Sequence, residues 1–91
     1  MIFVWDDDKN KKNIAKHGVT FEEAKSVFFD DFAKLIADPD HSEHEDRFIL
    51  LGLSSNIKLL VVVHVYKEED EIVRIISARK ATTKEQKFYQ R

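Results

Sequence analysis

The sequence contains no cysteine, one proline and two glycines among its 91 residues. Without cysteine, the chain has neither a disulfide framework nor a thiolate metal site. No apolar run approaches the roughly 20 residues that a membrane-spanning helix needs. The first residues, Met1 to Asp6, lack the basic start and the small-residue cleavage site of a signal peptide. We therefore expect a single cytoplasmic domain covering residues 1–91.

The composition favours a packed globule, since 43% of the residues are apolar and 11% are aromatic. The net charge of −2 argues against a dedicated nucleic-acid-binding domain, which is usually basic. The charges are nevertheless segregated. Residues 9–16 carry four lysines and no acid, residues 22–46 carry nine acids and two lysines, and residues 74–91 carry six cations and one acid. The two basic segments could form one positive surface, although ordinary solvated faces explain the same pattern.

Two helices are predicted in the first third of the chain. Three aspartates at residues 6–8 suit a helix N-terminus, and Gly18 is the usual residue just past a helix end. One basic stripe is predicted on this helix, formed by Lys9, Lys12 and Lys16 with Asn13 beside them. Residues Thr20 to Glu23 match a capping box, which predicts a second helix ending near Asp30 with its apolar face in the core.

The rest of the chain reads as strands followed by a last helix. Strands are expected at residues 33–37, 47–53, 58–66 and 71–79, with Lys67–Asp70 as the turn of a hairpin. Thr82 and Glu85 form a second capping box, and Lys84 belongs to a basic stripe on the helix that follows. Together with a short strand at residues 2–5, this order predicts an α+β fold. Its sheet would be an antiparallel meander of about four strands, with helices packed on it.

Polar side chains interrupt the apolar pattern of the predicted hairpin. His64 lies in its first strand, and Arg74, Ser77 and Arg79 lie in its second. Burying an unpaired cation is costly, so we expect function here. Pairing Tyr66 with Glu71 puts Arg74 on one face with Arg47 of the preceding strand, and puts His64, Ser77 and Arg79 on the other. A bulge or a one-residue slip would change this division.

A polar loop, residues 38–46, contains His41 and His44 among five acids. These side chains could in principle hold a divalent ion. Loops of this composition are usually only solvated, and the spacing matches no metal-binding signature. We therefore expect no metal and no cofactor.

Many short motifs, in the same order along the chain, resemble the BrnT toxins of bacterial type II toxin–antitoxin systems. The residues that carry the resemblance are Phe3, Trp5, Asp6, Lys9, Asn13, Lys16–Val19, Phe21–Ala24, Asp38, Pro39, His41, Ser42, Glu45, Arg47, Val62–His64, Arg74–Arg79, Ala81, Thr82, Glu85 and Tyr89. The resemblance implies a RelE-like fold, RNA cleavage and inhibition of translation. It also implies neutralisation by BrnA, an antitoxin with a ribbon–helix–helix end that binds operator DNA for the pair.

Metal-independent RNA cleavage requires a base for the ribose 2′-OH, cations for the phosphorane and an acid for the leaving 5′-oxygen. The guanidinium fork matches phosphate oxygens, so we assign stabilisation of the phosphorane charge to Arg79 and Arg74, with Arg47 as a weaker candidate. His64 is the natural acid or base. Tyr89 and Glu23 are reserve proton-transfer groups. The predicted substrate-binding residues are Lys9, Lys12, Asn13, Lys16 and Lys84.

Each role has a structural alternative. His64 could be a core histidine, Arg79 could pair with Glu85, and Arg74 and Arg47 could form ion pairs with Glu71 or Glu45. For the whole chain, the alternative to a ribonuclease is a non-catalytic binding module, either a degenerate toxin or a small RNA-binding domain. A metal-dependent enzyme that uses residues 38–46 is a third possibility.

Overall fold

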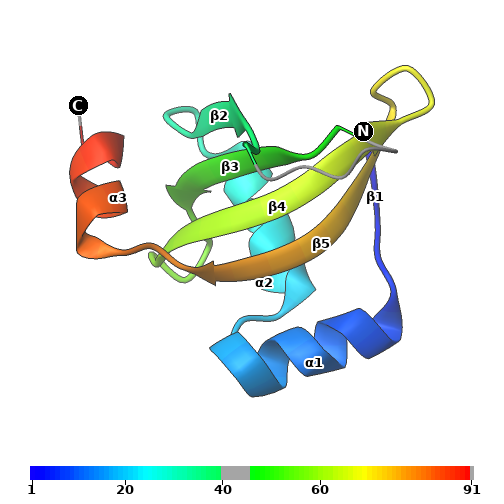
Figure 1. Cartoon of the computed structure of the whole chain (residues 1–91), viewed down its shortest axis with the longest axis horizontal. Helices are drawn as coiled ribbons and strands as arrows, with labels where there is room; N and C mark the ends of the chain where they lie inside the picture. The colour runs from blue at the N-terminus through cyan, green and yellow to red at the C-terminus, as the bar shows by residue number, and fades with distance from the viewer. Residues whose placement is uncertain (40–45, 91) are drawn as a thin grey trace.

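The computed structural model describes residues 1–39 and 46–90. Its elements follow in the order β1 (Ile2–Val4), α1 (Asp7–His17), α2 (Phe21–Ser26), the 3₁₀ turn η1 (Val27–Phe29), β2 (Lys34–Ala37), β3 (Phe48–Leu53), β4 (Leu59–Lys67), β5 (Ile72–Lys80) and α3 (Thr83–Tyr89). The strands form one sheet in the order β1-β5-β4-β3-β2. In Figure 1, α2 lies behind the sheet, α1 runs below β5, and α3 stands beyond the ends of the central strands. The predicted α+β class and the positions of the three helices are confirmed.

The sheet differs from the predicted meander of about four strands. Strands β2 to β5 are an antiparallel meander as expected, but β1 is a fifth strand and pairs with β5 in parallel. Its three pairs join Ile2 to Ile72, Phe3 to Val73 and Val4 to Arg74. A strand of three residues is too short for its sequence pattern to predict which strand it pairs with, so tertiary packing decides its partner. The Phe3 ring packs edge-on against Phe28, with 5.0 Å between centroids.

The caps of α1 lie where the sequence predicts them. The Asp6 carboxylate accepts hydrogen bonds from the backbone N–H of Asp8 and Lys9, at 2.8 and 3.1 Å. Gly18 ends the helix with φ 69°, and its N–H donates to the Ile14 carbonyl at 2.8 Å. These contacts join residues at most four positions apart, which explains why the sequence pattern locates both ends.

The predicted capping box of α2 is only half formed. Thr20 Oγ1 accepts a hydrogen bond from Glu23 N–H at 3.0 Å. The Glu23 carboxylate does not return a bond to Thr20. It accepts a hydrogen bond from Ser54 Oγ at 2.7 Å instead, and so joins α2 to the turn after β3. A tertiary partner thus replaces the local one.

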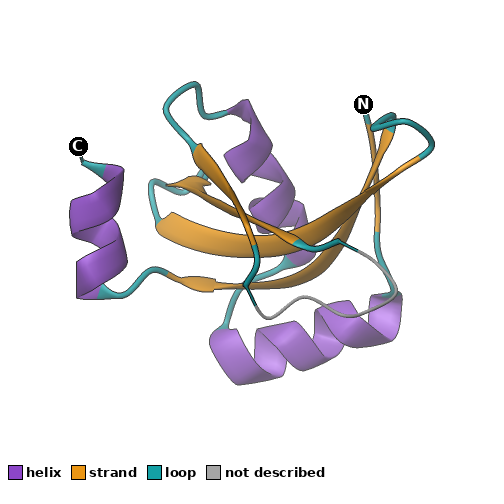
Figure 2. Cartoon of the chain, turned by 45° about the horizontal axis from the view of Figure 1, so that its top comes forward, coloured by secondary structure: helices purple, strands orange, loops and turns teal. Residues whose placement is uncertain are grey.

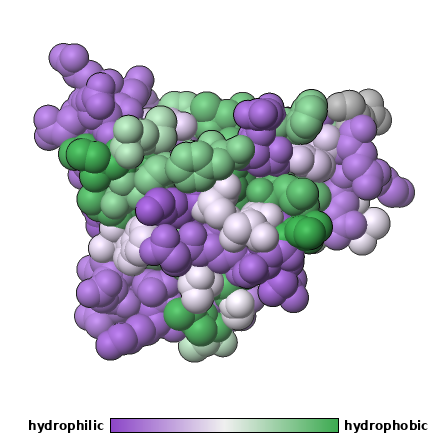
Figure 3. Space-filling model, turned by 180° about the vertical axis from the view of Figure 1, so that it is seen from behind, coloured by the Kyte–Doolittle hydropathy of each residue, from purple (hydrophilic) through white to green (hydrophobic). Residues whose placement is uncertain are grey.

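The core lies between α2 and one face of the sheet. Val19, Phe21, Ala24 and Val27 are fully buried on the helical side. The sheet supplies Leu50, Leu60, Val62, Val73, Ile75 and Ala78. Figure 2 shows the strongly twisted sheet passing in front of α2. In Figure 3, which views the molecule from behind, hydrophobic surface forms a band across the upper part, and hydrophilic surface covers the lower left.

Gly52 lets this layer pack closely. A Cβ atom at Gly52 would lie 2.8 Å from Val27 Cγ1 and 2.8 Å from Ala33 Cβ, inside any normal contact distance. The absence of a side chain on β3 therefore allows η1 to pack directly on the strand.

The hairpin between β4 and β5 has a different register from the one predicted. Lys67 pairs with Ile72, and the turn comprises residues 68–71. Glu68, Glu69 and Asp70 all have φ between 53° and 71°. A β-bulge then interrupts the ladder: His64 pairs with Ile75 but Val63 pairs with Ser77, so Ile76 has no partner. The alternation of side chains therefore shifts by one residue between Ile75 and Ser77.

Candidate functional site

Because of this bulge, three predicted site residues of β5 lie on one face of the sheet. Arg74, Ser77 and Arg79 pair with Val65, Val63 and Val61 of β4, which share a face by alternation. We call the side that these residues share, opposite α2, the arginine face. His64 pairs with Ile75 and lies on the core side. The predicted grouping of His64 with Ser77 and Arg79 was wrong, because the bulge moves the last two to the face of Arg74.

Arg79 is held by a carboxylate of α3. Its Nη1 lies 2.8 Å from Glu85 Oε1 and its Nη2 lies 2.9 Å from Glu85 Oε2, a bidentate pair. The Arg79 side chain is 40% exposed and that of Glu85 31%. The hydrogen bonds from Arg79 lower the pKa of Glu85 to about 2, so its carboxylate is ionised at neutral pH. Hydrogen bonding to Glu85 likewise raises the pKa of Arg79.

Arg74 and Arg47 have a different environment from Arg79. Arg74 is half-buried in β5, with Val65 of β4 on one side and Val4 of β1 on the other. Arg47 precedes β3, and its buried Nε atom has no hydrogen-bond partner within the described part of the chain. Among residues 1–39 and 46–90, neither arginine forms a salt bridge. The proposed alternative partner Glu45 lies outside the described residues.

His64 is fully buried among aromatic rings. Phe28, Phe48 and Tyr66 surround it, with ring centroids 4.8, 6.3 and 5.0 Å away. Its Nδ1 lies 3.2 Å from the Val62 carbonyl and its Nε2 lies 3.1 Å from the Tyr66 hydroxyl. Burial lowers the pKa of His64 to about 4, so the ring is neutral at pH 7. In this conformation His64 contacts the core and is separated from the arginines by the sheet.

The predicted lysine stripe lines a shallow groove between α1 and β5. We call this the cationic groove, and its lining residues are Lys9, Lys12, Asn13, Lys16, His17, Ile76 and Ser77. Ser77 also belongs to the arginine face, so the groove reaches that face at the bulge. The structure therefore places the lysines of α1 beside β5, whose contribution to the groove is Ile76 and Ser77.

Asn13, which lines the cationic groove, is buried and hydrogen-bonded to the protein backbone. Its side chain is 6% exposed, and its amide Nδ2 donates to the carbonyls of Val19 and Ala78, each at 2.8 Å. Its Oδ1 accepts a hydrogen bond from Ala78 N–H at 3.1 Å. These contacts use both amide hydrogens and the oxygen, so the predicted contact between Asn13 and substrate is revised to a role in joining α1 to β5.

The remaining candidates lie on or near α3 and α2. Lys84 is exposed on the first turn of α3. The Tyr89 hydroxyl donates to Asp30 Oδ2 at 2.5 Å, and this bond raises the pKa of Tyr89 to about 12. Glu23 accepts its bond from Ser54. The two reserve proton-transfer groups, Tyr89 and Glu23, are therefore engaged in contacts that join secondary-structure elements.

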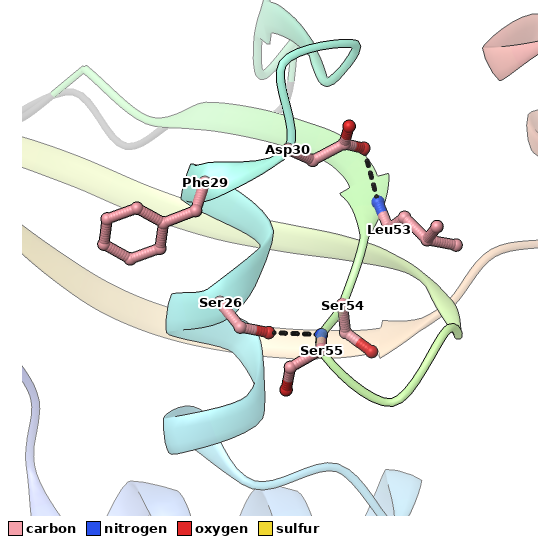
Figure 4. Close-up of a pocket in the computed structure, with 6 residues that line it drawn as sticks. All are labelled: Ser26, Phe29, Asp30, Leu53, Ser54 and Ser55. Carbon is pink, nitrogen blue, oxygen red and sulfur yellow. Dashed lines mark hydrogen bonds between the residues drawn. The ribbon is translucent and has the colours of Figure 1, made fainter.

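Asp30 is a residue that the sequence did not single out. Besides Tyr89, its carboxylate accepts hydrogen bonds from the N–H of Phe32 and of Leu53, at 3.0 and 2.8 Å. Figure 4 shows the Leu53 bond beside a second bond, from Ser55 N–H to Ser26 Oγ, across a pocket lined by six residues. One of the carboxylate's partners is more than 50 residues away in sequence, so no local pattern could reveal this role.

Among the described residues, no helix is long and apolar enough to cross a membrane. Nor do three histidine, aspartate or glutamate side chains converge in a way that could hold a metal ion, within residues 1–39 and 46–90. The candidate metal residues His41 and His44 lie outside that part of the chain.

Comparison with known proteins identifies a family and a similar solved structure. The family model described as "Ribonuclease toxin, BrnT, of type II toxin-antitoxin system" matches residues 5–85. The crystal structure of the Brucella abortus ribonuclease toxin BrnT superposes with a TM-score of 0.67 at 24% sequence identity, covering 91% of this chain and 100% of the other. No curated protein matches this chain. The family match spans most of the sequence, and the chain therefore belongs to the BrnT family of ribonuclease toxins of type II toxin–antitoxin systems.

Proposed function

We propose that this protein is a cytoplasmic, metal-independent endoribonuclease with a RelE-like fold. Its cleavage of RNA inhibits translation, and a BrnA-like antitoxin neutralises it and supplies the contact with operator DNA. The single observation that carries the proposal is the arginine face, where Arg74, Ser77 and Arg79 lie together and meet the cationic groove of α1. Family membership supports the same activity.

In this proposal the arginines stabilise negative charge as the RNA is cleaved. The ribose 2′-OH loses its proton to a base as its oxygen attacks the adjacent phosphorus, the phosphorane gains negative charge, and the 5′-oxygen leaves and takes up a proton. Arg79 is assigned to the phosphorane, because a guanidinium fork holds two phosphate oxygens and remains charged. Arg74 is five residues away, roughly 15 Å along a strand, so it suits a neighbouring phosphate better than the same one. Arg47 is a further candidate for that second role.

The position of His64 limits the part it can play. A general acid or base must come within hydrogen-bond reach of the proton it transfers, and His64 lies on the core side of the sheet. Its catalytic assignment stays a proposal that one variant decides: His64→Phe keeps an aromatic ring in the core but cannot transfer a proton. Without His64, water takes the 2′-OH proton and protonates the leaving 5′-oxygen, while arginine charge and in-line positioning stabilise the transition state.

The lysines of the cationic groove are assigned to phosphates that flank the cleaved bond. Lys9, Lys12 and Lys16 are all exposed, so each can contact a phosphate without desolvation. Lys84, on the first turn of α3, offers a further cation next in sequence to Glu85, the partner of Arg79. Neutralising phosphates releases counterions, so RNA affinity should fall as salt rises. Lys12→Ala should weaken binding to all RNA sequences to a similar extent.

The test is cleavage of total RNA, with and without ribosomes, by the purified protein in EDTA. We expect the wild type to cleave and Arg79→Ala to lose at least tenfold in rate, with an unchanged far-ultraviolet circular dichroism spectrum. Lys25→Ala is the matched control, because Lys25 pairs with Glu22 on α2, away from the arginine face. Equal activity of Arg79→Ala and wild type would remove Arg79 from the site, and loss of activity in EDTA would favour a metal-dependent enzyme.

A non-catalytic binding module is the second candidate, and one observation favours it. Glu85 already neutralises Arg79 in the free protein, which is the state expected of a degenerate toxin. Expression of the protein without antitoxin separates the two candidates, because a binding module should leave growth unaffected. Growth arrest by the wild type that is lost in Arg79→Ala supports the ribonuclease.

A further inference from the structure

The guanidinium of Arg79 is already bound by groups of the protein itself. Both of its terminal nitrogens bind the Glu85 carboxylate, and Nη1 also donates to the Lys80 carbonyl at 3.2 Å. A phosphate that binds end-on, as the Glu85 carboxylate does, needs the same N–H group of each terminal nitrogen, since bidentate recognition of phosphate and of carboxylate uses one geometry. Glu85 and an RNA phosphate therefore cannot both bind end-on to Arg79, and Glu85 neutralises the guanidinium charge while it stays bound.

Glu85 is held in place by the start of α3 as well as by Arg79. Its Oε1 accepts a hydrogen bond from Thr82 N–H at 2.8 Å, and Thr82 Oγ1 accepts one from Glu85 N–H at 3.2 Å, a complete capping box. The carboxylate can leave Arg79 and still cap the helix through Thr82. Release of Arg79 therefore does not require α3 to unfold.

Helix α3 itself is joined to the rest of the protein mainly by polar contacts. None of its residues is buried. Besides the Arg79–Glu85 pair, Tyr89 donates to Asp30, and Lys34 Nζ donates to the Phe88 carbonyl at 2.5 Å. Contacts of this kind, which are only partly shielded from water, can be exchanged for others. This makes Glu85 a replaceable partner of Arg79.

We propose that Glu85 is an internal competitor for substrate phosphate, which neutralises Arg79 in the free toxin and must be displaced before Arg79 binds RNA. This inference rests on the proposed role of Arg79 in the site. Glu85 acts through Arg79, so it is a residue that controls the charge of the site rather than a catalytic residue.

Glu85→Gln is the decisive variant, because the amide oxygen can still accept the hydrogen bond from Thr82 while the negative charge is gone. The probe is a short single-stranded RNA carrying 2′-O-methyl groups throughout, which binds but cannot be cleaved by its own 2′-oxygen. Affinity measured over a range of salt concentrations is the readout. Glu22→Gln is the matched control, since it makes the same charge change on α2, where Glu22 pairs with Lys25.

We expect Glu85→Gln to bind this RNA roughly two- to fivefold more tightly than wild type, the range that an ion pair open to solvent on one side can supply. The dependence of affinity on salt should also become steeper, by about 0.7 in the slope of log K against log salt, because one more cation is free to neutralise a phosphate. Glu22→Gln should change the affinity and its salt dependence less than Glu85→Gln does. A loosened helix alone would not steepen the slope, and Thr82→Ala, which removes the hydroxyl cap but keeps the Glu85 charge, provides that comparison.

The Arg79→Ala background separates this inference from the proposed function. If Arg79→Ala weakens binding and Glu85→Gln has no effect beyond Arg79→Ala in the double variant, both ideas stand. If Arg79→Ala weakens binding but Glu85→Gln binds no more tightly than wild type, Glu85 only orients Arg79 and the competitor role is wrong. If Arg79→Ala binds and cleaves like wild type, the proposed site fails and the inference fails with it.

Discussion

The side chain of Asn13 pairs with the backbone of Ala78 as a neighbouring strand would. Two hydrogen bonds, of 2.8 and 3.1 Å, join the amide of α1 to the carbonyl and N–H of Ala78 in β5. Strand β1 pairs with β5 only from Ile72 to Arg74, so no strand among residues 1–39 and 46–90 pairs with this edge of β5 at Ala78. Asn13 satisfies the backbone there, and it fixes α1 and its lysines beside the arginine face.

Replacing Asn13 should therefore destabilise the protein. Asn13→Ala leaves a buried N–H and two carbonyls without their partners, and we expect a loss of roughly 2–3 kcal/mol in the free energy of unfolding. Urea denaturation measures the change. Lys11→Ala, an exposed position on the same helix, is the control and should change stability by less than about 0.5 kcal/mol. A similarly small loss in Asn13→Ala would show that water replaces the amide.

Stability should decrease as the pH falls from 7 toward 5, because of His64. Its pKa is lowered from 6.5 to about 4 in the folded protein, so between these values the unfolded chain binds the proton that the folded chain excludes. The free energy of unfolding should fall by roughly 2 kcal/mol between pH 7 and pH 5, and the contribution should be fully present above pH 6.5. Urea denaturation at several pH values measures it.

His64→Phe is the matched variant, since it keeps the ring and removes the titration. Its stability should change far less than that of wild type between pH 7 and pH 5. The same variant tests the catalytic proposal for His64. RNA cleavage that persists in folded His64→Phe assigns the ring to the core, whereas loss of cleavage with the fold intact would restore His64 to the mechanism.

Gly52→Ala should be destabilising although it adds a single methyl group. That group would lie 2.8 Å from both Val27 and Ala33, so η1 would have to move away from β3. Overpacking of this kind costs about 1–3 kcal/mol, and thermal or urea denaturation detects it. Gly18→Asn is an instructive contrast, because nothing lies near Gly18 and asparagine tolerates its φ of 69°. A smaller loss in Gly52→Ala than in Gly18→Asn would contradict the packing argument.

Tyr89→Phe should release the end of α3 without disturbing the core. The variant loses the bond to Asp30, which leaves the pair of Arg79 and Glu85 and the Phe88 contacts to hold the helix. Amide hydrogen exchange should become faster across residues 83–89 and stay unchanged in β4 and β5. Within α3, the change in exchange rate should be smallest at Glu85, which lies near the other end of the helix. Unchanged exchange throughout α3 would show that the Asp30 bond is dispensable.

The helix ends, the existence of the hairpin and the family could all be predicted from sequence, whereas the register of the hairpin could not. Asp6, Gly18, Thr82 and Glu85 mark helix ends through hydrogen bonds that span at most four residues, so the pattern and the structure depend on the same short stretch. The charge pattern left open whether the two basic segments form one positive surface. The bidentate pair of Arg79 and Glu85 was foreseen only as an alternative, because its strength depends on how α3 is placed.

The sequence by itself determined the α+β class and the position of each helix, because local hydrogen bonds and periodic apolar residues encode them. Only the tertiary structure decided which of the candidate residues share a face of the sheet. One unpaired residue, Ile76, moves Ser77 and Arg79 to the face of Arg74 and leaves His64 in the core. A bulge is chosen by the packing of two strands against each other and against α2, and no pattern within a single strand contains that information.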